Sequence, residues 1–234
     1  MKNFILPLVV GIITLSCNSN QKNSDSSDKD ISTTNIEKYD CLQKYEEDYA
    51  ALITKEEFAS VYPFDVDSVE EDLQNQPRGY GHYTLQWKSG RPDKEMVISG
   101  IAVPIPDQDM MSVNMLSTVS DSKDMEGVKN LFDRGYKKLS DEELAEIDKN
   151  LDKASAEVGE TGKKLMEARK NRNYDFIEGL GNSAWYRWNE NTGGELAVLA
   201  GNMKFLIRTK VGEDPKENER ISKQLANIIL KKCN

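Results

Sequence analysis

Side chains that commonly catalyse reactions are scarce or unpatterned in this chain of 234 residues. Its only histidine, His82, would have to serve any Ser-His-Asp or Cys-His site, and a zinc site usually needs more nitrogen or thiolate ligands. His82 falls on the polar side of an alternating segment, which predicts an ordinary exposed histidine. The sequence has no Gly-x-Ser-x-Gly, His-Glu-x-x-His or phosphate-binding glycine loop. We therefore expect no enzyme activity, no metal and no cofactor.

Carboxylates are abundant, but their spacing defines no site. Clusters such as Glu46-Glu47-Asp48 and Glu70-Glu71-Asp72 lack the regular Asp series and distant Glu of a Ca²⁺ loop. With 40 acidic residues in the chain, solvated surface is the favoured interpretation. A glycosidase-like pair of carboxylates stays open as the less favoured alternative, because its two members can come from distant positions.

A run of aromatic residues with an arginine, Trp185-Tyr186-Arg187-Trp188, is the best candidate for binding. Exposed rings and arginine are the side chains that contribute most at interfaces. In a strand, alternate side chains point to opposite sides, so part of the run packs in the core. The exposed set is then either Trp185 with Arg187 or Tyr186 with Trp188. Trp185, Arg187 and Trp188 are taken as candidate binding residues.

The beginning of the chain resembles the signal peptide of a bacterial lipoprotein. Lys2 precedes an apolar run from Phe4 to Leu15 that is too short to span a bilayer. The following Leu15-Ser16-Cys17 is similar to a lipobox, which implies removal of residues 1–16 and acylation of Cys17. The resemblance implies an envelope lipoprotein attached to the membrane through acyl chains. The expected place is the outer membrane, on its periplasmic face or at the cell surface.

The other two cysteines are expected to pair. If Cys17 carries lipid, Cys41 and Cys233 remain, and an oxidising compartment favours a disulfide between them. Such a bridge would close almost the whole domain and contribute roughly 4–5 kcal/mol by the chain-entropy model. A reactive thiol at Cys233 is the less favoured alternative.

Charge and composition limit partners and domains. The chain has 31 basic and 40 acidic side chains, a formal net charge of −9, which disfavours nucleic acid as a partner. Residues 17–35 are polar, with a single aliphatic side chain, and predict a flexible tether after the lipidated cysteine. We expect one folded domain over residues 36–234.

Local patterns predict strands in two regions of this domain. Residues 82–88 alternate and are expected to pair with residues 96–103 in a hairpin, while residues 110–119 are ambiguous between strand and helix. Strands are also predicted at residues 184–188, 195–200 and 203–209, with a tight turn at Gly201-Asn202. Met203, Phe205, Ile207 and Thr209 should face the core, with Lys204, Leu206 and Arg208 on the other side.

Helices are predicted from capping signals and apolar spacing. Thr54 to Glu57, Ser68 to Glu71 and Ser140 to Glu143 have the form of capping boxes, and Asp214-Pro215 opens a closing helix. Residues 137–172 predict a long amphipathic helix, broken in places by glycine, that packs on its own sheet or on a partner helix. Short turns between consecutive strands favour an α+β domain, with an antiparallel sheet and helices packed on it.

Part of this pattern is similar to a known fold. The segment Gly179-Leu180-Gly181-Asn182-Ser183-Ala184-Trp185-Tyr186, the hairpin after it and the closing helix resemble the C-terminal half of small envelope lipoproteins with PsbP/Mog1-like sandwiches. Residues 52–58 are similar to the helix that opens such domains. The resemblance implies a PsbP/Mog1-like fold and transfers no catalytic residue, and the helical segment 137–172 departs from it.

The favoured function is therefore non-enzymatic binding by an envelope lipoprotein, with a protein or another envelope component as partner. An inhibitor or immunity-type lipoprotein, whose acidic surface neutralises a basic toxin or hydrolase, is the alternative. An envelope hydrolase using a carboxylate pair is the least favoured hypothesis.

Overall fold

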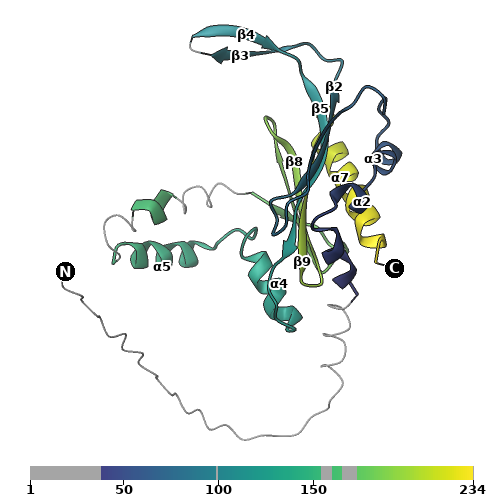
Figure 1. Cartoon of the computed structure of the whole chain (residues 1–234). Helices are drawn as coiled ribbons and strands as arrows, with labels where there is room; N and C mark the ends of the chain where they lie inside the picture. Colours follow the sequence, from purple (N-terminus) through teal and green to yellow (C-terminus); the bar gives the residue numbers. More distant parts are fainter. Residues whose placement is uncertain (1–37, 99, 154–159, 165–172, 234) are drawn as a thin grey trace, which may run out of the picture.

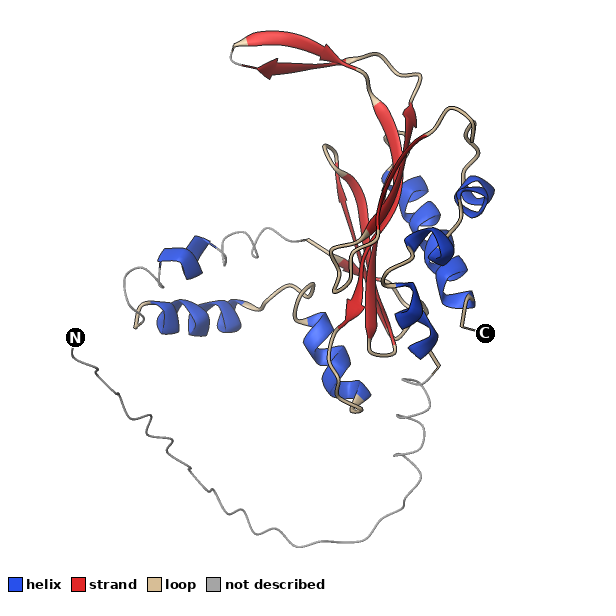
Figure 2. Cartoon of the chain, in the orientation of Figure 1, coloured by secondary structure: helices blue, strands red, loops and turns tan. Residues whose placement is uncertain are grey.

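The computed structural model describes residues 38–233 apart from residue 99 and the segments 154–159 and 165–172 (Figures 1 and 2). The predicted signal peptide, Cys17 and the tether up to residue 35 lie outside the described residues. No helix in the described part is both long and apolar enough to cross a bilayer.

A seven-stranded sheet forms the centre of the domain, and every neighbouring pair in it is antiparallel. Its strand order is β1-β2-β5-β9-β8-β7-β6. Their bounds are β1 Glu70–Gln74, β2 His82–Lys88, β5 Gln108–Thr118, β6 Asp175–Phe176, β7 Ser183–Asn189, β8 Gly193–Ala200 and β9 Met203–Lys210. The predicted α+β class with an antiparallel sheet is confirmed.

Helices cover one face of this sheet and part of the other (Figure 1). On the first face lie η1 (Asp40–Tyr45), α2 (Tyr49–Leu52), α3 (Lys55–Val61) and the closing helix α7 (Pro215–Lys231). On the second face lies α4 (Met125–Asp133), and α5 (Asp141–Leu151) stands away from the sheet. We call the first the helix face and the second the open face.

The helix face holds the main core. Phe205 and Ile207 of β9 are fully buried there against Ile221 and Leu225 of α7. Met203 and Thr209 are buried too, so the predicted inward side of β9 is confirmed. α7 begins as predicted, because Asp214 accepts a hydrogen bond from the backbone N–H of Lys216 and proline follows it. Glu217, in the first turn of α7, pairs with Arg220.

A disulfide joins the two ends of the described chain. Cys41 lies in η1 and Cys233 lies just beyond α7, with 5.6 Å between their Cα atoms and a sequence separation of 192 positions. Both cysteines pack against the core of the helix face. The structure thus contains the disulfide expected from the sequence.

The predicted hairpin between residues 82–88 and 96–103 is wrong. β2 pairs instead with β5, from His82 opposite Asn114 to Lys88 opposite Gln108. Residues 96–103 belong to a separate hairpin, β3 (Lys94–Ile98) and β4 (Ile101–Ile105), which projects from the end of the sheet (Figure 2). Gly100, with φ of +83°, lies in the short turn of this hairpin. Because a short turn costs less loop entropy, residues 94–98 pair with the segment that directly follows them.

Two helix predictions also change. The capping signal at Ser68 starts no helix, because residues 70–74 pair with β2 as an edge strand, and this pairing overrides the local preference. In the described part of segment 137–172 the helix is not continuous, and residues 154–159 and 165–172 of the predicted helix lie outside the described residues. α5 begins after its capping box at Ser140, ends at Leu151 and has no buried residue. Residues 160–164 form a second helical piece, and Gly162 packs closely against the Leu151 side chain.

Candidate functional site

The aromatic run in β7 is divided between the two faces of the sheet. Tyr186 is buried and Trp188 is half-buried on the helix face, in contact with the main core. Trp185 and Arg187 point to the open face, which settles the alternative that the sequence left open. Trp185 packs in a small apolar cluster with α4.

The contacts of Trp185 join the sheet to α4. Its Nε1–H donates a hydrogen bond to Oδ1 of Asp133 at 2.8 Å, at the end of α4. Burial raises the pKa of Asp133, but hydrogen bonds from Lys129, Ser183 and Trp185 outweigh this, so the pKa lies below its ordinary value. Trp185 therefore holds α4 onto the sheet, whereas Arg187 lines a cavity.

That cavity, of about 650 Å³, lies between the base of the β3–β4 hairpin and the open face. Its basic lining comes from three separate regions, namely Lys94 in β3, Arg187 in β7, and Arg208 and Lys210 in β9. Its apolar lining comes from the hairpin and the start of β5, namely Met96, Ile105, Pro106 and Met110. Four basic side chains in one cavity are unexpected in a chain with a net charge of −9.

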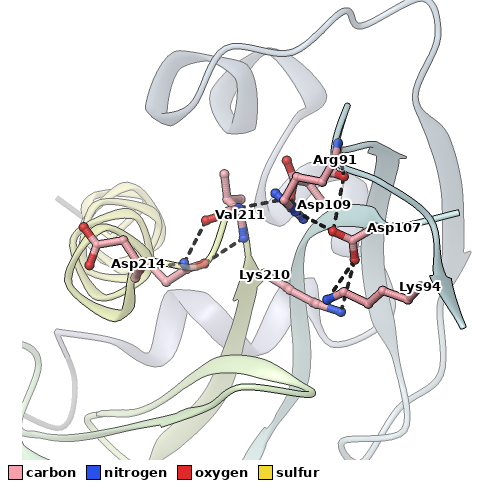
Figure 3. A network of polar contacts seen from close by, with 10 residues as sticks. Arg91, Lys94, Asp107, Asp109, Lys210, Val211 and Asp214 are labelled. Carbon is pink, nitrogen blue, oxygen red and sulfur yellow. Dashed lines mark hydrogen bonds and ion pairs between the residues drawn. The ribbon is translucent and has the colours of Figure 1, made fainter.

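A buried carboxylate, Asp107, organises the end of the cavity nearest the hairpin (Figure 3). Its side chain is only 1% exposed. Arg91 donates to it through Nε, Lys94 Nζ lies 3.1 Å from its Oδ1, and Lys210 Nζ lies 4.0 Å from the same oxygen. Burial raises the pKa of Asp107, but the hydrogen bonds from Arg91 and Lys94 and their charges outweigh it. The pKa therefore lies below its ordinary value, and Asp107 is an anion at neutral pH.

Arg91 also links this network to the loop between β9 and α7. Its Nη2 donates to Oδ1 of Asp109 at 2.6 Å, and the same oxygen accepts the backbone N–H of Gly212 at 3.0 Å. The network therefore fixes the start of β5 relative to that loop, as Figure 3 shows.

A second carboxylate, Glu195, organises the other end of the cavity. It accepts a hydrogen bond from Nε of Arg208 at 3.0 Å and from the hydroxyl of Tyr174, and Arg187 Nη2 lies 3.3 Å away. The Arg187 guanidinium also lies over the Tyr174 ring, 5.0 Å from its centroid. Burial raises the pKa of Glu195, but the Tyr174 hydrogen bond and the two arginine charges outweigh it. The pKa is lowered, so Glu195 is ionised as well.

Positive charge exceeds negative charge across the two networks. Five basic side chains surround three carboxylates, an excess of two positive charges, and Glu95 at the cavity rim offsets one of them. The basic residues are Arg91, Lys94, Arg187, Arg208 and Lys210, and the carboxylates are Asp107, Asp109 and Glu195. The arrangement can attract and orient an anion.

Sequence reasoning found only Arg187 of these residues, and it did so because of the neighbouring rings. The available signal was the alternation of β9, which placed Arg208 on the side away from the core. His82 lies on β2 outside this cavity, with Nε2 2.9 Å from Oδ2 of Asp72. Among the described residues, no group of three or more His, Cys, Asp or Glu side chains is arranged to hold a metal ion.

No protein-family model matches this chain, and neither the curated proteins nor the solved structures give a match. The geometry of the cavity is therefore the basis on which a function is inferred.

Proposed function

We propose that this chain is an exported lipoprotein, acylated at Cys17 and held at the outer membrane, that works by binding and not by catalysis. The signal-peptide pattern of residues 1–17 supports export and acylation. The disulfide between Cys41 and Cys233 supports export independently, because such bonds persist in oxidising compartments. The binding site is the cavity between the β3–β4 hairpin and the open face, and its partner is a component of the envelope.

The cavity lining is the observation that carries the binding role. Its two buried carboxylates, Asp107 and Glu195, are held as anions by basic partners. A general acid must hold a proton near neutral pH, and an effective base needs a pKa near that pH. Paired carboxylates with lowered pKa values fit neither role, whereas they fit well as supports that position basic side chains.

We also propose that the domain is PsbP/Mog1-like. The antiparallel sheet with α7 packed on one face supports this, together with the resemblance of residues 179–186. In this proposal the α5 region is an inserted helical segment that lies outside the common core. An experimental structure that superimposes on a PsbP/Mog1-like sandwich would support this proposal. An experimental strand order that differs from the order in such a sandwich would contradict it.

Labelling with radioactive palmitate tests the lipoprotein proposal in cells. We expect the wild-type chain to incorporate label and to sediment with membranes, and the Cys17→Ser variant to do neither. The Cys41→Ser variant is the matched control, because it removes a cysteine that the proposal does not acylate. Recovery of the wild-type chain from the cytosol with residues 1–16 still attached would contradict the proposal.

A further inference from the structure

We propose that the cavity binds an amphiphilic anion, a molecule with one carboxylate or phosphate head and an apolar chain. This inference rests on the proposed binding function and adds the chemical class of the ligand. It follows from basic side chains with unused donors and from the apolar lining that lies beside them.

The head group of the ligand would contact basic side chains that have unused hydrogen-bond donors. Arg208 uses Nε for Glu195, and its two terminal nitrogens meet no acceptor within the described part of the chain. Its side chain is 48% exposed, so these nitrogens are accessible. A guanidinium presents its donors as a planar fork that matches a carboxylate or a phosphate.

Lys210 adds a second incompletely paired charge. Its nearest carboxylate oxygen, Oδ1 of Asp107, is 4.0 Å away and is already contacted by Lys94 at 3.1 Å. Asp107 also accepts Arg91, so one carboxylate is shared among three cations. One carboxylate cannot balance three positive charges, so a bound anion would balance the positive charge that remains.

The apolar part would lie beside these cations. The register places Met110 of β5 between Lys210 of β9 on one side and Gln86 of β2 on the other. Ile105 and Pro106 continue the apolar lining toward the hairpin, where Met96 is 52% exposed. The lining therefore changes from basic to apolar between adjacent strands, and an apolar chain would remove the apolar side from water.

Size and desolvation together require both parts of the ligand. A cavity of about 650 Å³ lies in the range of small-molecule sites, roughly 300–1,000 Å³, and an inorganic ion would occupy little of it. An uncharged amphiphile would cover the Arg208 fork without supplying an acceptor, which carries a desolvation cost. A ligand with an acidic head and an apolar chain satisfies both surfaces.

Calorimetric titration of the full mature chain tests this inference. The chain carries Cys17→Ser, so that it has no acyl chains of its own. The probes are octyl phosphate, octanoate, octyl glucoside and inorganic phosphate, with each amphiphile below its micelle concentration. We expect octyl phosphate or octanoate to bind at least about tenfold more tightly than octyl glucoside and than inorganic phosphate, because only the first two offer both parts. The stronger of the two then identifies the head group.

Two variants and one control locate the site. Arg208→Gln and Lys210→Gln should each weaken binding of the anionic amphiphile about tenfold, because each removes a charge-assisted contact. Lys204→Gln is the matched control on the same face of β9, next to the separate hollow beside α4, and should change binding less than about twofold. Circular dichroism checks that each variant is folded.

Several outcomes would overturn the inference. If octyl glucoside binds as tightly as the anionic amphiphiles, the cavity does not recognise an acidic head. If inorganic phosphate binds as tightly as the anionic amphiphiles, the cavity does not recognise an apolar chain. Absence of binding, or equal losses in Lys204→Gln and Arg208→Gln, would remove this ligand class from the cavity. Palmitate labelling at Cys17 is independent of all these results, so the lipoprotein proposal would stand or fall separately.

Discussion

The two faces of the sheet differ in how completely the chain covers them. The helix face is filled by α7, α2 and α3, and its strand side chains, such as Phe205 and Ile207, are fully buried. On the open face, a buried apolar cluster around Leu206 and Ala197 lies where α4 packs. Beyond α4 it carries Arg187, Glu195 and Arg208 beside a cavity. Since β9 contributes to both faces, one strand serves stability on one side and the proposed binding on the other.

This difference shows where a change in sequence is tolerated. On the helix face, a lost methylene leaves a void in a closely packed interior. On the open face, a change near the cavity alters charge at a solvent-accessible surface, where effects on stability are small. Substitutions on the helix face should therefore act on folding, and substitutions by the cavity should act on ligand affinity.

The largest expected effect comes from removing the disulfide that closes the helix face. The double variant Cys41→Ser, Cys233→Ser should lower the free energy of unfolding by roughly 4–5 kcal/mol, because the unfolded chain gains the entropy of a very long loop. Urea unfolding measures this, and wild-type chain under reducing conditions is the control. A loss below about 1 kcal/mol would show that packing alone holds this face together.

The next effect compares two neighbours on β9 that point to opposite faces. Phe205→Ala should cost roughly 3–5 kcal/mol of unfolding free energy, because its ring is fully buried in the main core. Lys204→Ala, on the open face, should stay within about 0.5 kcal/mol. Denaturant unfolding of both variants measures the contrast. Similar losses in the two would mean that the faces do not differ in the way described.

The smallest effect concerns the ionised carboxylate under the cavity. The pKa of Asp107 is lowered in the folded chain, so its ionised form stabilises the fold above its ordinary pKa of 3.8. This contribution is lost as the pH falls through the folded pKa, which lies below that value. The unfolding midpoint of the wild type should therefore fall more steeply below about pH 4 than that of Asp107→Asn. Parallel curves of unfolding midpoint against pH for the wild type and Asp107→Asn would contradict this prediction. Asp121→Asn, at an exposed position, is the control.

Local signals in the sequence predicted several helix starts, one turn and the disulfide. Thr54 and Ser140 cap their helices as their residue types predict, because a capping box involves only four consecutive residues. The turn at Gly201-Asn202 joins β8 to β9, with Ala200 opposite Met203. If Cys17 is acylated as proposed, two cysteines remain, which made the disulfide a simple inference.

The rest depends on contacts between distant segments, which local patterns do not specify. β2 pairs with β5, although the whole β3–β4 hairpin lies between them in sequence. No residue near position 88 indicates that the next strand of the sheet comes after this hairpin. The cavity collects basic residues from positions as far apart as Lys94 and Lys210. Each of them is an ordinary surface residue in its own segment, so only the register of the sheet reveals that they share a site.

The bridge between Cys41 and Cys233 has a consequence for damage by proteases. Because the two half-cystines are 192 positions apart in sequence, the described chain is very nearly a covalent ring. A single cut anywhere within that ring opens it without releasing either piece. Both fragments stay joined to the segment before Cys41, so a nicked molecule would remain wherever its amino-terminal end is fastened.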